Sequence, residues 1–570
     1  MKKLIGIVML LAGANLVLAG SKAGPDLNGT AQNTAVNVIV QFGSAPTKNE
    51  LKQLGPFGQL KKVFAHVNAA TVTLTPAQIA ALLAGDPNIT YISPDRTNQG
   101  ALDLTTTAVN ANLAWTYGFN GTGIGVAVID SGISAHDDLK TANGTGSRIV
   151  YSQSFLAGAD ASDQYGHGTH VAGIIGSNAA DSTGPSHTRS YKGVAPNVNL
   201  IDLRVLDANG AGTDSAVIAA IDTAIALRST YNIRVINLSL GRPVFESYTL
   251  DPLCQAVEAA WKAGIVVVTA AGNYGRAGTN GSKGYGTIAS PGNDPYVITV
   301  GAMNTMGTMA TFDDKIASYS SKGPTAIDHI VKPDLVAPGN AVVSLLASPN
   351  VTLATTYPQT LIDTSAYTNG AAGRSGRYFQ LSGTSMATPV VAGAAALLLQ
   401  KTPSLTPDQV KARLMKTARK ALPVYMTSIE KTSKIAYLNQ SDIFTIGAGY
   451  IDINGALANN DLVTRAATSP QAVYNPVTKS VSINRDMTIV GSTVIWGDTV
   501  VWGDTVVWGD TAVWGVFVFK PGISSSTVLW GDTVVWGDSA SAAFTVIWGD
   551  TAIGAANLAP FDVGDEDSAQ

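Results

Sequence analysis

The sequence is poor in cysteine and in charged residues. Its 570 residues include a single cysteine, Cys254, so an intramolecular disulfide framework is excluded, and we expect this thiol to be a small buried apolar side chain. Charged residues make up 13% of the chain and the formal net charge is −4, which creates no field that would attract nucleic acid. With 45% hydrophobic residues and 58 glycines, the chain is expected to be folded and rich in turns, and its length favours two or more folding units.

Long apolar runs are also lacking after the N-terminus. Two lysines precede an apolar run at residues 4–18, which is short for a membrane-spanning helix, and small residues follow it. This layout is typical of a secretory signal peptide, with candidate cleavage points before Gly20 and before Gly24, and a membrane anchor is the alternative. We predict a signal peptide at residues 1–23 and a secreted protein, extracellular or at the cell surface, with no membrane span after cleavage.

Residues 24–103 have the pattern of a small α+β unit. Pro76 follows Thr75, which suits a helix start, and strand-like runs lie on both sides of this segment. Such spacing predicts a compact α/β plait. The strand-like runs are residues 36–40, 70–74 and 89–92, and the helix-like segment is residues 76–83.

Residues 104–460 alternate apolar strand patterns with helix patterns. Strands that are apolar on both faces indicate a parallel sheet covered on both sides by helices, which predicts a three-layer α/β domain. Sites in such sheets lie at the carboxyl ends of the strands, and Asp130, Ser239 and Asn273 fall at strand ends. The strand-like runs are residues 124–129, 200–206, 235–240, 265–269 and 296–300, and the helix-like stretches include residues 214–227 and 252–263.

Residues 461–570 contain a hexapeptide repeat. Trp-Gly-Asp recurs at residues 496, 502, 508, 530, 536 and 548, with a degenerate copy at residue 514. The β-favouring residues before each Gly-Asp pair indicate short strands joined by tight turns, and a short-period β-solenoid is the alternative. The tail is therefore expected to be β-rich or irregular.

Three motifs carry the chemistry. They are Val-Ile-Asp-Ser-Gly around Asp130, Gly-His-Gly-Thr-His around His167 and Gly-Thr-Ser-Met-Ala-Thr-Pro around Ser385. In this order they closely resemble the motifs of the subtilisin-like serine peptidases, and the resemblance covers all of residues 104–460. The resemblance implies a subtilisin-like catalytic domain that acts as a broadly specific serine endopeptidase on proteins and peptides. It also implies that the reaction needs no cofactor.

The three residues suit the roles that the resemblance implies. A serine hydroxyl is a weak nucleophile until a base removes its proton, and His167 would be that base. Asp130 would hold the imidazole in the useful tautomer. Ser385 precedes a helix-like run at residues 390–399, so main-chain N–H groups of the helix N-terminus would face the developing oxyanion, and Pro389 is expected in the first turn.

The resemblance also places an oxyanion donor and the substrate-binding segments. Asn273 matches the family asparagine whose side chain donates to the oxyanion. Residues 289–292 match the floor of the pocket for the residue before the scissile bond (P1), and they contain no acidic side chain, which predicts an apolar or mid-sized P1 residue. The residues expected to bind substrate are Ser239, Leu240, Gly241, Gly210, Ala211, Gly212, Ala271 and Gly272.

Metal binding has two candidate places. His167 and His170 could form a metal pair, but their spacing is three and no glutamate lies between them, so we expect His170 to pack behind the site. Asp138 resembles a family aspartate that ligates calcium, which makes structural calcium a candidate. The loop at residues 177–191 departs from the family pattern, however, and a solvated aspartate is the favoured interpretation of Asp138.

Residues 24–103 resemble the inhibitory propeptide of the same family. We expect this unit to fold first, to assist folding of the catalytic domain, to be cut off by Ser385 between Asp95 and Thr107, and then to act as an inhibitor. The mature enzyme is expected to be a monomer. The rival function is a surface adhesin or binding module in which the repeat tail binds the partner and the protease domain serves only processing.

Overall fold

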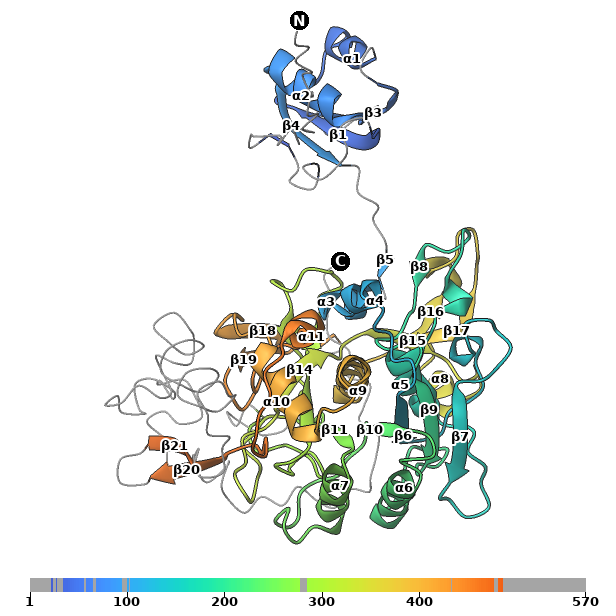
Figure 1. The fold of residues 1–570 in the computed structure, drawn as a ribbon, viewed down its shortest axis with the longest axis vertical. Coiled ribbons are helices and arrows are strands. Elements are labelled where there is room, and N and C mark those ends of the chain that lie inside the picture. Colours follow the sequence, from blue (N-terminus) through green and yellow to red (C-terminus); the bar gives the residue numbers. More distant parts are fainter. Residues whose placement is uncertain are drawn as a thin grey trace, which may run out of the picture. The chain divides into compact units, whose positions relative to one another are not determined.

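The computed structural model describes the chain as two compact units, Met1–Gln99 and Gly100–Gln570 (Figure 1). The apolar run at residues 4–18 and the Trp-Gly-Asp repeats lie outside the described residues. The described residues are 22–23, 27, 34–55, 58–64, 68–94, 100–101, 103–276, 284–431, 433–475 and 480–484.

The first unit contains an antiparallel four-stranded sheet in the order β2-β3-β1-β4. The predicted helix start is confirmed, because the Thr75 side chain accepts the N–H of Gln78 and the Gln78 side chain accepts the N–H of Thr75. Helix α1 and strand β2 were not predicted; β2 is short and its four residues are exposed, so it has no apolar pattern. The elements are β1 Val36–Phe42, α1 Lys48–Leu54, β2 Leu60–Val63, β3 Ala69–Leu74, α2 Pro76–Gly85 and β4 Ile89–Pro94.

The second unit is built on an eight-stranded sheet whose order is β13-β12-β11-β10-β6-β9-β7, with β14 beside β12. All pairs are parallel except β12–β13, which confirms the predicted parallel sheet. Every residue of β6, β11 and β12 is buried, as the doubly apolar patterns required. The strands are β6 Gly125–Asp130, β7 Ile149–Ser154, β9 Asn199–Arg204, β10 Ile233–Leu238, β11 Val266–Ala270, β12 Ile298–Asn304, β13 Lys315–Ile316 and β14 Leu335–Pro338.

Helices cover both faces of this sheet. Helices α5 and α9 pack against each other and against the central strands, whereas α6 and α7 pack together and contact β6, β10 and β11 (Figure 1). The predicted three-layer α/β architecture is therefore confirmed. The helices are α3 Asp103–Ala108, α4 Ala111–Thr116, α5 His167–Gly176, α6 Asp214–Ala226, α7 Pro252–Lys262, α8 Thr352–Thr356, α9 Thr384–Lys401, α10 Pro407–Thr417 and α11 Ile453–Ala458.

Smaller sheets surround this domain. A three-stranded antiparallel sheet, β15-β17-β16, lies beside α5, and three strand pairs, β5–β8, β18–β19 and β20–β21, complete the described strands. Their bounds are β5 Gly100–Ala101, β8 Arg189–Ser190, β15 Val342–Leu345, β16 Leu361–Asp363, β17 Arg374–Leu381, β18 Tyr425–Ile429, β19 Ala436–Gln440, β20 Gln471–Asn475 and β21 Ser480–Asn484.

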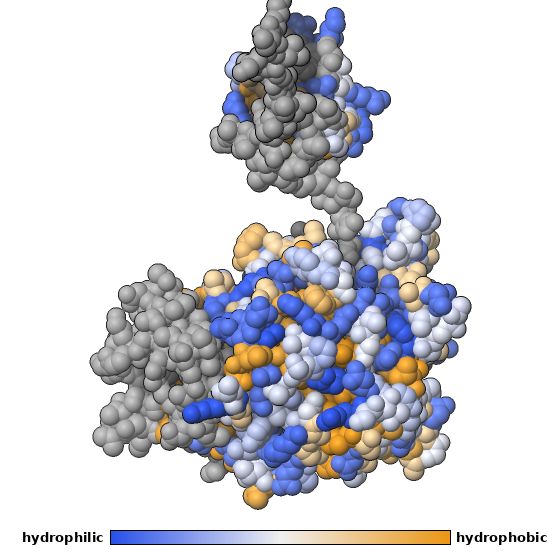
Figure 2. All heavy atoms as spheres, viewed as in Figure 1, coloured by the Kyte–Doolittle hydropathy of each residue, from blue (hydrophilic) through white to orange (hydrophobic). Residues whose placement is uncertain are grey.

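The surface mixes polar and apolar residues, and the single cysteine is buried. Hydrophilic and hydrophobic residues are interspersed on the face of the molecule shown in Figure 2. None of the helices in the described part of the chain has the length and apolar character needed to cross a bilayer. Cys254 is fully buried in α7, as expected, and burial raises the pKa of its thiol.

Candidate active site

The end of β6 and the start of α5 bring Asp130 and His167 together. Asp130 is the last residue of β6 and His167 the first of α5, and both side chains are buried. His167 Nδ1 lies 2.7 Å from Asp130 Oδ1, which also accepts the main-chain N–H of Ser131 at 2.7 Å. Because a carboxylate only accepts hydrogen bonds, Nδ1 carries the ring proton here, and Nε2 is left as the basic nitrogen.

The surroundings of His167 favour its protonated form. Burial alone would lower the pKa of His167, but the charge of Asp130, the hydrogen bond to it and the charge of Asp163 together raise that pKa above its ordinary value. The imidazole is therefore held as a stronger base than a free histidine.

Asp163 and Ser131 build the N-terminus of α5. Asp163 is buried, and its carboxylate accepts the N–H groups of Gly166 at 2.6 Å and Thr169 at 2.9 Å. The Ser131 hydroxyl donates to Asp163 at 2.8 Å and accepts the N–H of Gly168 at 2.8 Å. These bonds satisfy N–H groups that have no partner within a helix, and they hold the first turn of α5 against the end of β6. The motif analysis missed Asp163, because it lies three residues before the N-cap residue Gly166, where a capping side chain is not normally sought.

Ser385 is the second residue of α9, and its hydroxyl has a partner other than histidine. Ser385 Oγ donates to the main-chain carbonyl of Ser239 at 2.9 Å. Between the described residues, no hydrogen bond joins Ser385 to His167. Such bonds are often long in ligand-free enzymes and shorten when substrate binds, so the arrangement suits a resting state.

Pro389 lies in the second turn of α9, so its predicted place in the first turn is wrong. The helix begins at Thr384, one residue before the serine, and Pro389 is its sixth residue. Because proline has no N–H, Pro389 leaves the carbonyl of Ser385 without its helical partner. The Ser239 hydroxyl takes that place and donates to the Ser385 carbonyl at 2.8 Å.

Asn273 follows β11 and lies beside the start of α9. Its Oδ1 accepts the main-chain N–H and the hydroxyl of Thr384, each at 2.9 Å. Its Nδ2 is buried and makes no hydrogen bond within the described part of the chain. A Cβ at Gly383 would lie 3.0 Å from this Nδ2, so glycine leaves room for the amide. Because the Oδ1 of Asn273 is held by two hydrogen bonds, its Nδ2 group is fixed in orientation and can donate to a ligand.

The segments predicted to line the P1 pocket are neighbours in the fold. Ala289 donates its N–H to the carbonyl of Ala271 at 2.9 Å, and Arg242 and Ser290 exchange main-chain hydrogen bonds of 3.0 and 2.8 Å. A Cβ at Gly272 would lie 3.2 Å from the Cβ of Ala289. The segments that contain Leu240 and Gly241, Ala271 and Gly272, and residues 289–292 are therefore close together in the fold.

An acidic residue outside those segments lies behind the floor. The Asp251 carboxylate is fully buried and accepts the Ser290 hydroxyl at 2.8 Å. Arg242 pairs with Asp251 at 2.9 Å and with Asp214 at 2.9 Å. Arg242 therefore pairs with the carboxylate that accepts the Ser290 hydroxyl, although it shares its positive charge between Asp251 and Asp214.

The second predicted substrate segment forms a tight turn. The N–H of Ala211 donates to the Asp207 side chain, and its carbonyl accepts the N–H of Asp207 at 2.8 Å. A Cβ at Gly212 would lie 2.5 Å from the carbonyl of Val205, so this glycine is required by its own chain. The N–H of Gly210 donates to the carbonyl of Asp207 at 3.0 Å, so the main-chain N–H groups of Gly210 and Ala211 are both engaged within this turn.

The metal pair of His167 and His170 does not form. The His170 ring is buried, lies 3.0 Å from the carbonyl of Val342 through Nε2, and packs edge-on against Phe379. Burial lowers the pKa of His170 to about 3, so it is neutral. The expectation that His170 packs behind the site is confirmed.

Asp138 is fully buried, so its interpretation as a solvated aspartate is wrong. Asp138 Oδ1 accepts the N–H of Asp181 at 2.8 Å, and Oδ2 accepts the Tyr378 hydroxyl at 2.7 Å and the Ser177 hydroxyl at 3.0 Å. Burial raises the pKa of Asp138, although His136 and these hydrogen bonds oppose that effect.

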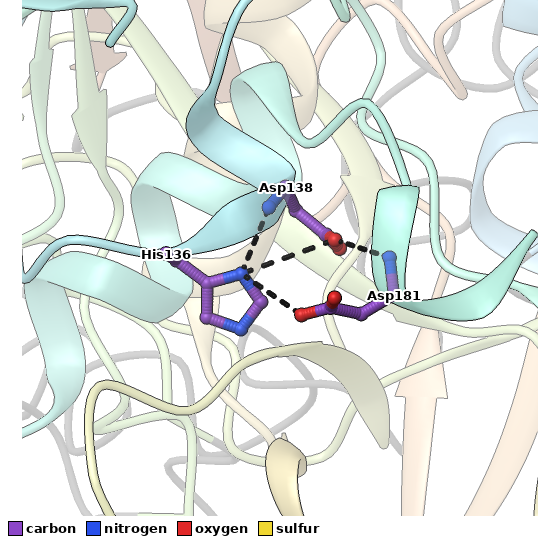
Figure 3. A group of neighbouring side chains, drawn as sticks. All are labelled: His136, Asp138 and Asp181. Atoms are coloured by element: carbon purple, nitrogen blue, oxygen red, sulfur yellow. Dashed lines mark hydrogen bonds and ion pairs between the residues drawn. The ribbon is translucent and has the colours of Figure 1, made fainter. Parts of the chain in front are cut away.

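The group His136, Asp138 and Asp181 offers one nitrogen and two carboxylates to a metal ion (Figure 3). His136 Nδ1 lies 3.9 Å from Asp138 Oδ1 and 3.8 Å from Asp181 Oδ2. Calcium requires six to eight oxygen ligands, whereas here the oxygens already accept hydrogen bonds and Arg377 pairs with Asp181. These residues do not fit calcium.

The chain is similar to several known proteins. The model of a family described as the subtilase family matches residues 121–447. The serine protease AprX of Bacillus subtilis (strain 168) is 38% identical over 66% of this chain and 81% of its own length, and subtilisin DY of Bacillus licheniformis is 35% identical over 61% and 96%. The solved structure of a cold-adapted subtilisin-like serine proteinase, 32% identical, covers 53% of this chain and 85% of its own with a TM-score of 0.38.

Proposed function

Since the chain belongs to the subtilase family and is a subtilisin-like serine peptidase, we propose that Asp130, His167 and Ser385 are its catalytic triad. The observation that carries the proposal is the 2.7 Å contact between His167 Nδ1 and Asp130, made by the two predicted residues from separate elements. Its substrates are proteins and peptides, as for other peptidases of this family.

The reaction begins when the Ser385 hydroxyl leaves the Ser239 carbonyl and turns to His167 Nε2. His167 takes the proton while Ser385 Oγ attacks the scissile carbonyl carbon, and Asp130 stabilises the imidazolium that forms. The negative oxygen of the tetrahedral intermediate accepts hydrogen bonds from Asn273 Nδ2 and the main-chain N–H of Ser385.

Collapse of the intermediate breaks the C–N bond, and His167 protonates the departing amine. A water molecule then gives a proton to His167 and attacks the acyl-enzyme, which releases the acid product and restores Ser385. No step uses a metal ion or a cofactor.

We further propose that the enzyme is secreted, that the unit at residues 24–103 is its inhibitory propeptide, and that the mature enzyme is monomeric and broadly specific. The order of the segments supports the assignment of the propeptide, because the small sheet unit ends directly before the catalytic unit. Peptide substrates would add as an extended strand along Gly210, Ala211, Gly212 and Gly241, with Ser239, Leu240, Ala271 and Gly272 shaping the cleft.

The decisive experiment labels the nucleophile. A sulfonyl fluoride should modify Ser385 in the active enzyme, and mass spectrometry of the peptide should locate the adduct. Ser385→Ala should lose about 10⁶-fold in kcat and all labelling, while its circular dichroism stays unchanged. Ser382→Ala, three residues earlier, is the matched control and should retain both activity and labelling. Full activity in Ser385→Ala would refute the proposal.

A further inference from the structure

Two buried arginines lie at the two ends of α5, the helix that begins with His167. Arg148 and Arg204 are 5% and 1% exposed. Arg148 precedes β7, and Arg204 is the last residue of β9. Neither contacts the groups proposed to react, but each binds main-chain segments that set the position of α5.

Arg148 ties the C-terminal end of α5 to three other segments. Its guanidinium donates to the carbonyls of Gly176 at 2.5 Å, Asp138 at 2.8 Å, Lys140 at 3.0 Å and Val198 at 3.1 Å. Gly176 is the last residue of α5, whose carbonyl has no partner within the helix. A cation at this end also interacts favourably with the helix dipole.

Arg204 ties the loop before the N-terminal end of α5. Its guanidinium donates to the carbonyls of Ser162 at 2.7 Å and Asp160 at 3.0 Å, and to the side-chain oxygen of Gln164 at 3.0 Å. Ser162 and Gln164 are the two neighbours of Asp163, which caps the first turn of α5. Arg204 therefore fixes the residue on which the orientation of this turn depends.

The ligands of these cations are almost all neutral oxygens. No ion pair in the described part of the chain involves Arg148, and the one ion pair of Arg204 there is with Asp160, which is exposed and 3.8 Å away. Oxygen cages of this kind also hold hard metal ions in proteins. A planar guanidinium with five N–H groups in a fixed fork can reach four oxygens at once, which a lysine ammonium with three N–H groups cannot.

We propose that Arg148 and Arg204 are positioning residues for His167: internal cations in carbonyl cages that fix the two ends of α5 and thereby hold the imidazole in line with Asp130 and Ser385. This inference rests on the proposed function, because it takes His167 as the catalytic base.

The test compares methionine and lysine replacements. Arg148→Met and Arg204→Met remove the charge and the donors at similar length, whereas Arg148→Lys and Arg204→Lys keep the charge. Arg228→Met, at an exposed arginine beyond α6, is the control. kcat and KM are measured per active site, titrated with a serine-directed reagent. The methionine variants should lose at least about tenfold in kcat with KM changed less than about twofold, and the lysine variants should recover part of the loss.

A second readout separates positioning from stability. In the Ser385→Ala background, which removes self-cleavage, the downfield proton resonance of the His167–Asp130 hydrogen bond should shift or broaden in the methionine variants and not in Arg228→Met. Because this resonance is measured without self-cleavage, it can be read in a methionine variant that folds but does not mature. If neither methionine variant folds, the kinetic comparison is made with the lysine variants.

Two results would overturn the inference. The first is a set of methionine variants whose resonance is unchanged and whose kcat per titrated site is within about twofold of the parent. The arginines would then contribute to stability and not to the position of His167. Lysine variants that keep the parent kcat and resonance would show that the guanidinium fork is not needed. Failure of the proposed function is recognised separately, because full activity of Ser385→Ala alone would refute it whatever the arginine variants do.

Discussion

Ser239 and Ser385 hold each other by two reciprocal hydrogen bonds: the hydroxyl of each donates to the main-chain carbonyl of the other, at 2.8 and 2.9 Å. The bond from the Ser239 hydroxyl replaces the helical hydrogen bond to the Ser385 carbonyl that is missing because Pro389 has no N–H. The bond from the Ser385 hydroxyl holds that hydroxyl against the segment at the end of β10. The proposed nucleophile is therefore joined to a predicted substrate-binding strand before any substrate is present.

Removing the Ser239 hydroxyl should destabilise the enzyme more than it slows the chemistry. In Ser239→Ala the buried carbonyl of Ser385 loses its only side-chain donor among the described residues, which costs about 1–3 kcal/mol in the free energy of unfolding. Urea unfolding of the sulfonyl-blocked enzyme measures this loss. Ser229→Ala, at an exposed position, is the control. Equal stability of the Ser239 and Ser229 variants would contradict the importance of this bond.

Removing the Asn273 side chain should lower kcat, because its Nδ2, which makes no hydrogen bond among the described residues, is placed to stabilise the transition state. Asn273→Ala should lower kcat by about 10²- to 10³-fold with little change in KM, because the oxyanion loses a donor that substrate does not need in the ground state. Thr384→Val removes one of the two donors that orient Asn273 and should cause a smaller loss. Steady-state kinetics on one peptide substrate decide the matter, and a purely KM effect of Asn273→Ala would count against an oxyanion role.

The raised pKa of His167 predicts the acid limb of the pH profile. His167 acts as a base only when neutral, so activity requires a pH above its pKa, and a raised pKa moves the limb upward. The kcat/KM profile should therefore fall on the acid side at a pH above the ordinary histidine value of about 6.5.

Asp130→Asn should move that limb to lower pH, since it removes the charge that raises the pKa of His167, and should lower kcat by about 10⁴-fold. Asp222→Asn, at an exposed position, should leave the limb in place. A limb unmoved in Asp130→Asn would be inconsistent with the assigned electrostatics.

Cleavage should favour apolar or mid-sized P1 residues. The pocket segments carry no acidic side chain, and Asp251 behind Ser290 is already paired with Arg242, so a buried basic side chain would find no unpaired carboxylate in these segments. Profiling with a peptide library measures the preference. A strict preference for arginine or lysine would show that Asp251 reaches the pocket.

Maturation should depend on Ser385. The sequence window for self-cleavage extends from Asp95 to Thr107, but α3 begins at Asp103, and a cleft that binds extended peptides does not accept a helix. The mature N-terminus is therefore expected between Asp95 and Asp103. N-terminal analysis of secreted wild type and Ser385→Ala tests this, because the variant should accumulate as a precursor that begins near Gly20 or Gly24. Normal processing of the variant in a host without other proteases would exclude self-cleavage.

The sequence by itself determined the main layers and the candidate residues. The doubly apolar runs predicted β6, β9, β10, β11 and β12 to within a few residues, because burial on both faces leaves a local pattern. The parallel strands β7 and β14 were not predicted, since β7 has no fully buried residue and β14 has only four residues. Short motifs that resemble those of the subtilisin-like peptidases identified Asp130, His167, Ser385 and Asn273 as candidate residues.

Only the tertiary structure decided how these groups are connected. The partner of the Ser385 hydroxyl, the free amide of Asn273, the capping carboxylate of Asp163 and the carbonyl cages of Arg148 and Arg204 all join segments far apart in the chain. The local sequence does not predict such contacts, because the same arginine or aspartate can be exposed to solvent in one fold and enclosed by main-chain groups in another. Asp138 makes the point directly: its sequence context suited water or calcium, and packing instead enclosed it among Tyr378, Ser177 and the main chain.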